Sequence, residues 1–281
     1  MKRDLAIPLV IIGAIAAGSL ILPMIAGADP LLIGDITSTR LLPPGSRDAD
    51  GSLHLLGTDR FGRDLFTRMM LAGRISLLVG VVGSILAGAV GTALGAIAGW
   101  WGGLIDRAVM WATDAMLAVP RLVLLLVCAA LWSPGTTTVI VVLVLTGWMG
   151  VARLVRVEVQ AARAEQYVDA ARALGATSSR VLWRHVLVNA SGPAVAATAL
   201  GVGNAVLLES GLSFLGLGVQ PPAPSWGNMI AGGRELVVSA PWVAIAPGLL
   251  LVLTVLACTL LGDALADRLA GRDPRSISER A

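Results

Sequence analysis

The sequence predicts an all-α membrane protein with six transmembrane helices and a helical cytoplasmic loop between the fourth and fifth of them. Of its 281 residues, 56% are apolar and 14% are charged, and the mean hydropathy is +0.81. Several uncharged runs reach the roughly 20 residues that a helix needs to cross the ~30 Å hydrocarbon core of a bilayer. These observations place the chain among multi-pass membrane proteins.

Composition also argues against several classes of binding. A net charge of +3 without clustered basic and aromatic residues does not suggest a nucleic-acid partner. Cys128 and Cys258 are far apart, as are His54 and His185, so neither a disulfide framework nor a metal site is expected. Lys2 is the only lysine and lies outside any glycine-rich turn, so the chain lacks a phosphate-binding loop. We expect no cofactor on this chain, and any use of ATP and Mg must belong to a partner.

The first uncharged run extends from Leu5 to Ala28, after Met1-Lys2-Arg3. It ends in Ala26-Gly27-Ala28, which is typical of a signal-peptide cleavage site, but the run is longer than the roughly 7–15 residues of a secretory signal. An uncleaved first helix with a cytoplasmic amino terminus is therefore expected, and the signal peptide is the alternative. The polar, turn-rich segment from Asp29 to Arg74 is expected outside the membrane, so 1–74 forms an amino-terminal unit.

The second run, Ile75 to Trp101, carries small residues at every fourth position. Four-residue spacing places them along one helix face, where another helix backbone can approach closely. The alternative is a span that is merely rich in glycine. The predicted packing residues are Gly83, Ala87, Gly91, Gly95, Gly99 and Gly103.

Three more spans follow. A polar break from Asp106 to Asp114 precedes a third span from about Ala115 to Trp132, in which Arg121 lies near the cytoplasmic end and can extend to the interface. Thr136 to Ala152 forms the fourth span, and Val186 to Leu208 forms the fifth.

The stretch from Ser210 to Gly233 is uncharged, but its prolines and glycines exclude a continuous helix, so it is expected to be a folded extracytoplasmic loop. Leu236 to Gly262 gives the sixth span, with a possible kink at Pro247. The predicted core is therefore 75–265, and 266–281 is a cytoplasmic tail. Six spans place 153–185 and this tail in the cytoplasm, where their arginines satisfy the positive-inside rule, although the segment 29–74 also carries arginines.

The loop between the fourth and fifth spans predicts two helices joined by a turn. Val151 to Leu174 is expected to be one helix, and Gly175 is the residue type that ends a helix. Thr177 or Ser178 can cap a second helix, which continues through 180–189 into the fifth span. This arrangement projects a helical knob from the membrane.

The segment Glu165-Gln-Tyr-Val-Asp-Ala-Ala-Arg-Ala-Leu-Gly175 resembles the EAA loop of bacterial ABC importer permeases, although Asp169 replaces the usual glutamate and Val188 the usual proline. The resemblance implies a coupling helix that inserts into an ATPase, and a complex of two ATPase subunits, a second homologous permease and an extracytoplasmic solute-binding protein. The alternative is an arginine-rich helix lying on anionic lipid. The coupling residues implied are Glu165, Asp169, Ala170, Ala171, Gly175, Arg180 and Arg184.

Further segments, 56–65 with 73–80 and 209–227, resemble the C-type permeases of dipeptide and oligopeptide importers. This implies a non-catalytic, inner-membrane peptide permease, and the same scaffold also serves nickel, haem and glutathione import. An ion-coupled carrier, the alternative from another class, would show ionisable residues within its spans and repeated halves. Residues at the pore mouth or at a docking surface for the binding protein are expected to be Asp59, Arg63, Asp64, Glu209 and Trp226, with purely structural roles as the alternative.

Overall fold

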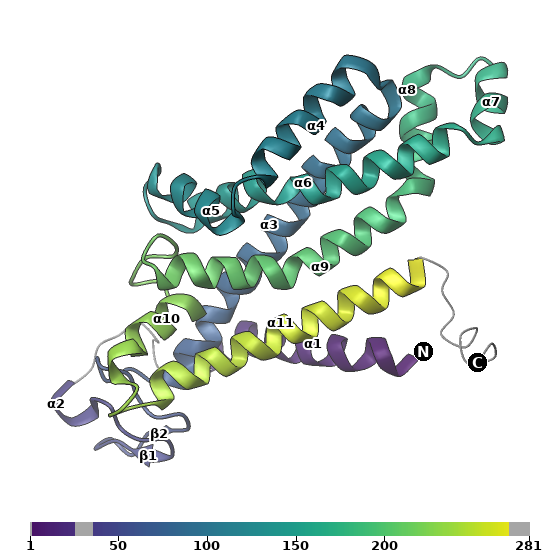
Figure 1. The fold of residues 1–281 in the computed structure, drawn as a ribbon. Helices are drawn as coiled ribbons and strands as arrows, with labels where there is room; N and C mark the ends of the chain where they lie inside the picture. Colours follow the sequence, from purple (N-terminus) through teal and green to yellow (C-terminus); the bar gives the residue numbers. More distant parts are fainter. Residues whose placement is uncertain (1, 26–35, 270–281) are drawn as a thin grey trace, which may run out of the picture.

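The computed structural model describes residues 2–25 and 36–269, and the chain forms a bundle of long helices (Figure 1). Within the described residues, five helices are long and apolar enough to cross a membrane. They are α1 (Lys2–Ile25), α3 (Leu65–Trp101), α6 (Thr136–Arg163), α9 (Leu187–Phe214) and α11 (Trp242–Leu269). The Ala26-Gly27-Ala28 stretch, where the alternative signal peptide would be cleaved, and the arginines beyond residue 269 lie outside the described residues.

Two shorter helices, α4 (Gly103–Leu117) and α5 (Arg121–Ala130), meet at a bend of 91° and are together apolar enough to form a broken span or a re-entrant loop. The prediction of six spans is confirmed when this bent pair is counted as one span. The third span was expected to be a continuous helix from 115 to 132, and this was wrong. Pro120 precedes α5 and has no N–H to continue the hydrogen bonds of α4, so the chain turns there.

The segment from Asp106 to Asp114 is helical, which corrects the expected polar break. Both aspartates lie on α4 and pair with arginines of α6, Asp106 with Arg156 and Asp114 with Arg153. The contact from Arg156 Nη2 to Asp106 Oδ2 is 2.6 Å. Because each carboxylate has a cationic partner on the neighbouring helix, the charges do not interrupt α4.

The α3–α6 contact depends on glycine. A Cβ added at Gly91 would lie 2.5 Å from the carbonyl oxygen of Trp148, and one at Gly95 would lie 2.4 Å from that of Ala152. Side chains cannot approach other atoms so closely, so these positions admit only glycine unless the helices separate. Five of the six predicted packing residues, from Gly83 to Gly99, are buried on α3.

The prediction that Gly103 belongs to this packing face was wrong, because α3 ends at Trp101 and Gly103 begins α4. Its φ is +58° and an added Cβ would meet nothing within 4 Å, so it serves the turn between the helices. The remaining glycine face is covered by α6 of the same chain, because Gly83 faces Leu143 and Gly99 faces the carbonyl of Arg156.

Helix α3 also packs on α1 and α9. Gly73 of α3 faces Ser19 of α1, and Gly80 faces Val206 of α9. Arg74 donates hydrogen bonds of 2.8 Å to the carbonyl of Ser19 and 2.7 Å to that of Leu20. Residues 74 and 75 lie inside α3, so the expected boundary between the amino-terminal unit and the core falls within a continuous helix.

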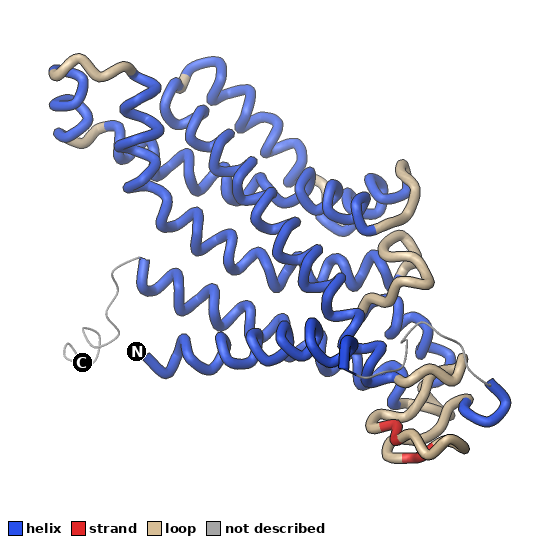
Figure 2. Tube along the Cα trace, turned by 180° about the vertical axis from the view of Figure 1, so that it is seen from behind, coloured by secondary structure: helices blue, strands red, loops and turns tan. Residues whose placement is uncertain are grey.

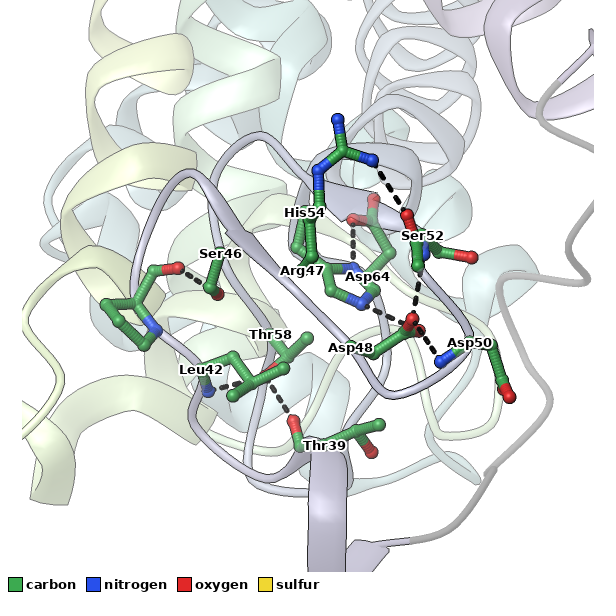
Figure 3. Close-up of polar contacts among 12 residues, drawn as sticks. Thr39, Leu42, Ser46, Arg47, Asp48, Asp50, Ser52, His54, Thr58 and Asp64 are labelled. Carbon is green, nitrogen blue, oxygen red and sulfur yellow. Dashed lines mark hydrogen bonds and ion pairs between the residues drawn. The ribbon is translucent and has the colours of Figure 1, made fainter.

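One end of the bundle carries irregular chain, visible as the tan segments of Figure 2 and here called the loop end (residues 36–64 and 215–241). It contains α2 (Ile36–Thr39) and the antiparallel strands β1 (Ser46–Arg47) and β2 (Leu53–His54). Figure 3 shows the polar contacts that fix it. His54 Nδ1 lies 2.9 Å from Asp64 Oδ2, its Nε2 lies 3.3 Å from Asp48 Oδ2, and Thr58 Oγ1 donates to the Thr39 carbonyl at 2.5 Å.

The stretch 210–233 was expected to be a loop, and the structure makes it partly helical. Helix α9 continues to Phe214, and α10 (Trp226–Gly233) begins after the prolines. Ser225 caps α10 by accepting from the backbone N–H of Asn228, whose side chain in turn accepts from the Ser225 N–H at 3.0 Å. The loop is therefore a folded element packed on α9 and α11.

Candidate functional site

The other end of the bundle, here called the knob end, contains residues 164–186. The chain forms the two expected helices there, but the first is interrupted after Arg163. Helix α6 ends at Arg163, and α7 (Gln166–Ala173) begins after an extended residue, Glu165. The expectation of one helix from Val151 to Leu174 was therefore wrong. Gly175 has φ +82° and ends α7, as predicted. Helix α8 (Ser178–Val181) and a π-helical turn, Leu182–Val186, continue directly into α9.

The break at 164–165 lets α7 turn one apolar side chain into the bundle. Val168 is fully buried and packs in a cluster with Val159 of α6 and with Val181 and Leu182 of the second helix. The rest of α7 is largely exposed, and Figure 1 shows it at the far corner of the molecule, beyond α8. A single buried side chain thus fixes a helix whose other faces remain free.

Trp100, which sequence reasoning did not single out, connects α3 to this knob. Its indole Nε1 donates to Ser178 Oγ at 2.9 Å, and Arg163 Nη1 donates to its carbonyl at 2.8 Å. The guanidinium of Arg172 stands 5.1 Å from its ring centroid, within the range of a cation–π interaction. Trp100 is the second-last residue of α3, and only the fold reveals that it reaches 72 and 78 positions along the chain.

The exposed surface of the knob combines charge with one large apolar side chain. Leu174 is 89% exposed at the tip. Asp169 is also exposed and lies 3.8 Å from Arg172. The predicted coupling residues Glu165, Ala170, Gly175, Arg180 and Arg184 are exposed as well, and Ala171 is half-buried. The tip of the knob therefore exposes an apolar side chain, Leu174, beside small residues and the Asp169 carboxylate.

The charged residues of the loop end pair with one another. Asp59 accepts from the Arg63 backbone N–H at 3.1 Å and from its Nε at 2.8 Å, and Arg68 Nε lies 3.8 Å away. Asp64 caps α3 by accepting from the Thr67 N–H at 2.8 Å, and also contacts His54. Asp59 and Arg63 nevertheless line a cavity of about 420 Å³ with Pro221, Asn228 and Met229.

Glu209 and Trp226 are fully buried, which is not where residues of a pore mouth were expected. The Glu209 carboxylate accepts from Ser213 Oγ at 2.7 Å and from Ser210 Oγ at 3.3 Å. The indole of Trp226 donates to the Met69 carbonyl at 3.1 Å. Trp226 therefore joins α10 to α3, whereas these partners of Glu209 lie on its own helix, α9.

These features define a class: a multi-pass membrane subunit without a nucleotide-binding loop, whose spans end in an exposed helical knob. The match is specific, since residues 91–272 fit the model of the binding-protein-dependent transport system inner membrane component. The chain belongs to that family and is a non-catalytic permease component of an ABC importer, located in the inner membrane. ATPase and permease partners follow from the family.

Most of the chain is similar in sequence to known permeases. A putative peptide permease of Brucella suis is 40% identical over 257 residues, covering 88% of this chain and 84% of that protein. The dipeptide transport system permease protein DppC of Alkalihalophilus pseudofirmus is 37% identical over 270 residues, covering 96% and 87%. A chain of the MetNI methionine ABC transporter, facing inward, shares the fold with a TM-score of 0.55 at 20% identity, covering 70% of this chain and 93% of that one.

Proposed function

We propose that this chain imports dipeptides or oligopeptides and that α7 is its docking element for an ATPase subunit. The observation that carries the coupling role is the exposed surface of α7, where Leu174 is 89% exposed and Asp169 and Gly175 flank it. The peptide cargo is supported by the similarity to a putative peptide permease and to a dipeptide permease.

In this proposal two ATPase subunits bind and hydrolyse ATP with Mg, one of them holding α7 of this chain and the other the knob of a second homologous permease. The contacts of Trp100 and Val168 fix the knob to α3 and α6, so its displacement moves spans rather than a loose loop. ATP binding favours the conformation in which the knobs are close, which shifts the membrane part between inward-open and outward-open states.

An extracytoplasmic binding protein delivers the peptide at the loop end. This orientation places the knob, the start of α1 and the end of α11 in the cytoplasm, and these three lie on one side of the bundle in Figure 1. We retain 75–265 as the transport core, 1–74 as an added span with its external segment, and 266–281 as a cytoplasmic tail.

The experiment reconstitutes the full set of subunits in liposomes and measures peptide-stimulated ATP hydrolysis for Asp169→Lys, Leu174→Glu and Gly175→Pro. Burial of a leucine side chain contributes roughly 1.5–3 kcal/mol, so Leu174→Glu should weaken ATPase binding by about tenfold or more. Val238→Glu is the control, because Val238 is 98% exposed at the loop end. Normal stimulation in all three knob variants contradicts the coupling role, and a wild type that takes up no peptide contradicts the cargo.

A further inference from the structure

Arg121 lies inside the bundle rather than at its cytoplasmic edge. It is the first residue of α5, directly after the 91° bend that breaks the crossing. Its side chain lines a cavity together with Ser84, Gly147 and Thr198, which lie well within α3, α6 and α9. The expected extension to the interface was therefore wrong, because the bend carries Arg121 to the level of the middle of three spans.

The cavity around Arg121 is small and is shaped by glycine. Its volume is about 60 Å³, enough for a few water-sized groups, each of which needs roughly 10–15 Å³. A Cβ at Gly147 would lie 3.3 Å from Arg121 Nη2 and 3.0 Å from Ala87 Cβ. The absence of a side chain at Gly147 therefore leaves room for the Arg121 guanidinium.

This arginine lacks a partner among the described residues. Its Nε is buried without a hydrogen-bond acceptor, and it forms no ion pair with a described carboxylate. The two aspartates of α4 are not available, since Asp106 pairs with Arg156 and Asp114 with Arg153. A charge inside a membrane protein is costly unless it is paired, and such residues mark solute pathways.

The other polar side chains of the cavity differ in whether they can still donate a hydrogen bond to a ligand. Ser84 Oγ already donates to the Thr198 carbonyl at 2.7 Å, and Thr198 Oγ1 to the Ala194 carbonyl at 2.8 Å. Asn204 is exposed and lines the same cavity, so its amide N–H groups can supplement the guanidinium. Arg121 and Asn204 together offer a charged donor and a neutral donor to one small anionic group.

We propose that Arg121, assisted by Asn204, binds the terminal carboxylate of the peptide as it passes through this subunit. The inference rests on the proposed peptide cargo. A guanidinium pairs with a carboxylate through two parallel hydrogen bonds, and the cavity admits a carboxylate but no bulky side chain. Every linear peptide carries this group whatever its sequence, so such a site holds different peptides in one orientation.

The test compares uptake of a dipeptide and of its C-terminal amide into liposomes that hold the complete importer. The binding protein is unchanged among variants, so the change in the acid-to-amide uptake ratio reports the permease alone. Arg121→Gln should lower this ratio by about tenfold, since a charge-assisted hydrogen bond contributes roughly 1.5–3 kcal/mol and 1.4 kcal/mol corresponds to tenfold. Asn204→Ala should lower it less, and Arg107→Gln, at an exposed arginine of α4, should leave it unchanged.

An unchanged ratio in Arg121→Gln, with uptake of the acid preserved, overturns the inference. Loss of the second permease from the purified Arg121→Gln complex also overturns it, because the guanidinium would then pair with a carboxylate of that subunit. If this variant does not fold, Arg121→Met removes the charge and keeps an unbranched side chain, and an unchanged ratio there is equally decisive. A wild type that transports neither form contradicts the proposed cargo instead.

Discussion

The indole of Trp100 donates a 2.9 Å hydrogen bond to the hydroxyl of Ser178, and this bond joins the last turn of α3 to the first residue of α8. Trp100 is 3% exposed, and its carbonyl accepts from Arg163, the last residue of α6. The ends of α3 and α6 and the start of the second knob helix therefore meet at one side chain. The position of α7 depends on that junction.

We predict that Trp100→Leu weakens the stimulation of ATP hydrolysis by peptide. The substitution removes the ring that Arg172 faces and the donor to Ser178, so α7 loses its fixed position. Peptide-stimulated ATP hydrolysis should fall several-fold in this variant. It should fall less in Trp100→Phe, which keeps an aromatic ring and loses only the hydrogen bond, worth about 1 kcal/mol. Trp111→Leu, at a 75% exposed tryptophan of α4, is the control. Equal activity of Trp100→Leu and Trp111→Leu would contradict the prediction.

Substitution of the buried glycines of α3 should destabilise the bundle. Gly91→Ala and Gly95→Ala place a methyl group 2.5 Å and 2.4 Å from carbonyl oxygens of α6, so the two helices must separate. Overpacking of this kind costs typically 1–3 kcal/mol. The midpoint of thermal unfolding in detergent should therefore fall for both variants. Gly150→Ala on α6 meets nothing within 4 Å, and its midpoint should stay at the wild-type value.

Glu209 should prove structural rather than substrate-binding. Its carboxylate is fully buried and accepts from Ser210 and Ser213, so Glu209→Gln keeps the shape and one acceptor oxygen. Peptide uptake by this variant should stay close to wild type. Glu209→Ala removes the acceptor of the Ser210 and Ser213 hydroxyls, and a buried donor without an acceptor costs roughly 1–3 kcal/mol, so its unfolding midpoint should fall. Abolished uptake by a well-folded Glu209→Gln would instead indicate contact with the cargo.

Asp48 should stabilise the loop end in a pH-dependent way. The Ser52 N–H bond, assisted by His54 and the Asp50 N–H and opposed by burial, holds the pKa of Asp48 below its ordinary value of 3.8. A carboxyl whose pKa is lower in the folded state stabilises it above the ordinary pKa, and this stabilisation disappears as the pH falls through the folded pKa.

The measurement for Asp48 is the difference in unfolding midpoint between wild type and Asp48→Asn. That difference should be present at pH 6 and shrink once the pH falls below 3.8, the ordinary value for this group. Asp50→Asn, at an exposed aspartate, should show little difference at either pH. A difference for Asp48→Asn that does not change over this range would show that the carboxylate charge has no role.

The spans and the knob could be predicted from sequence because both depend on local pattern. Uncharged runs identify helices that cross a bilayer, and the four-residue spacing of small residues identified the buried face of α3. Gly175 was predictable because a left-handed residue ends α7. The loss of Gly103 from the packing face and the break at Glu165 could not be foreseen, since each depends on where the chain must turn to reach another helix.

Long-range pairing accounts for most of what sequence patterns missed. The charges at 106–114 suggested a polar loop, but arginines of α6 neutralise them and the segment stays helical. Trp100 and Arg121 looked like ordinary boundary residues. Their surroundings are assembled from α3, α6 and α9, and no window of sequence contains them together.

Helix α3 has 37 residues, which corresponds to about 55 Å at 1.5 Å per residue, well beyond the ~30 Å of the hydrocarbon core. Asp64 holds its first turn to the loop end through His54, and Trp100 holds its last turn to the knob. Because both ends are tied to folded elements, any tilt of α3 would move the loop end and the knob together. A tilt of 5° about its centre displaces the two ends by roughly 2 Å in opposite directions, so events on one face of the bilayer reach the other mechanically, through a single helix.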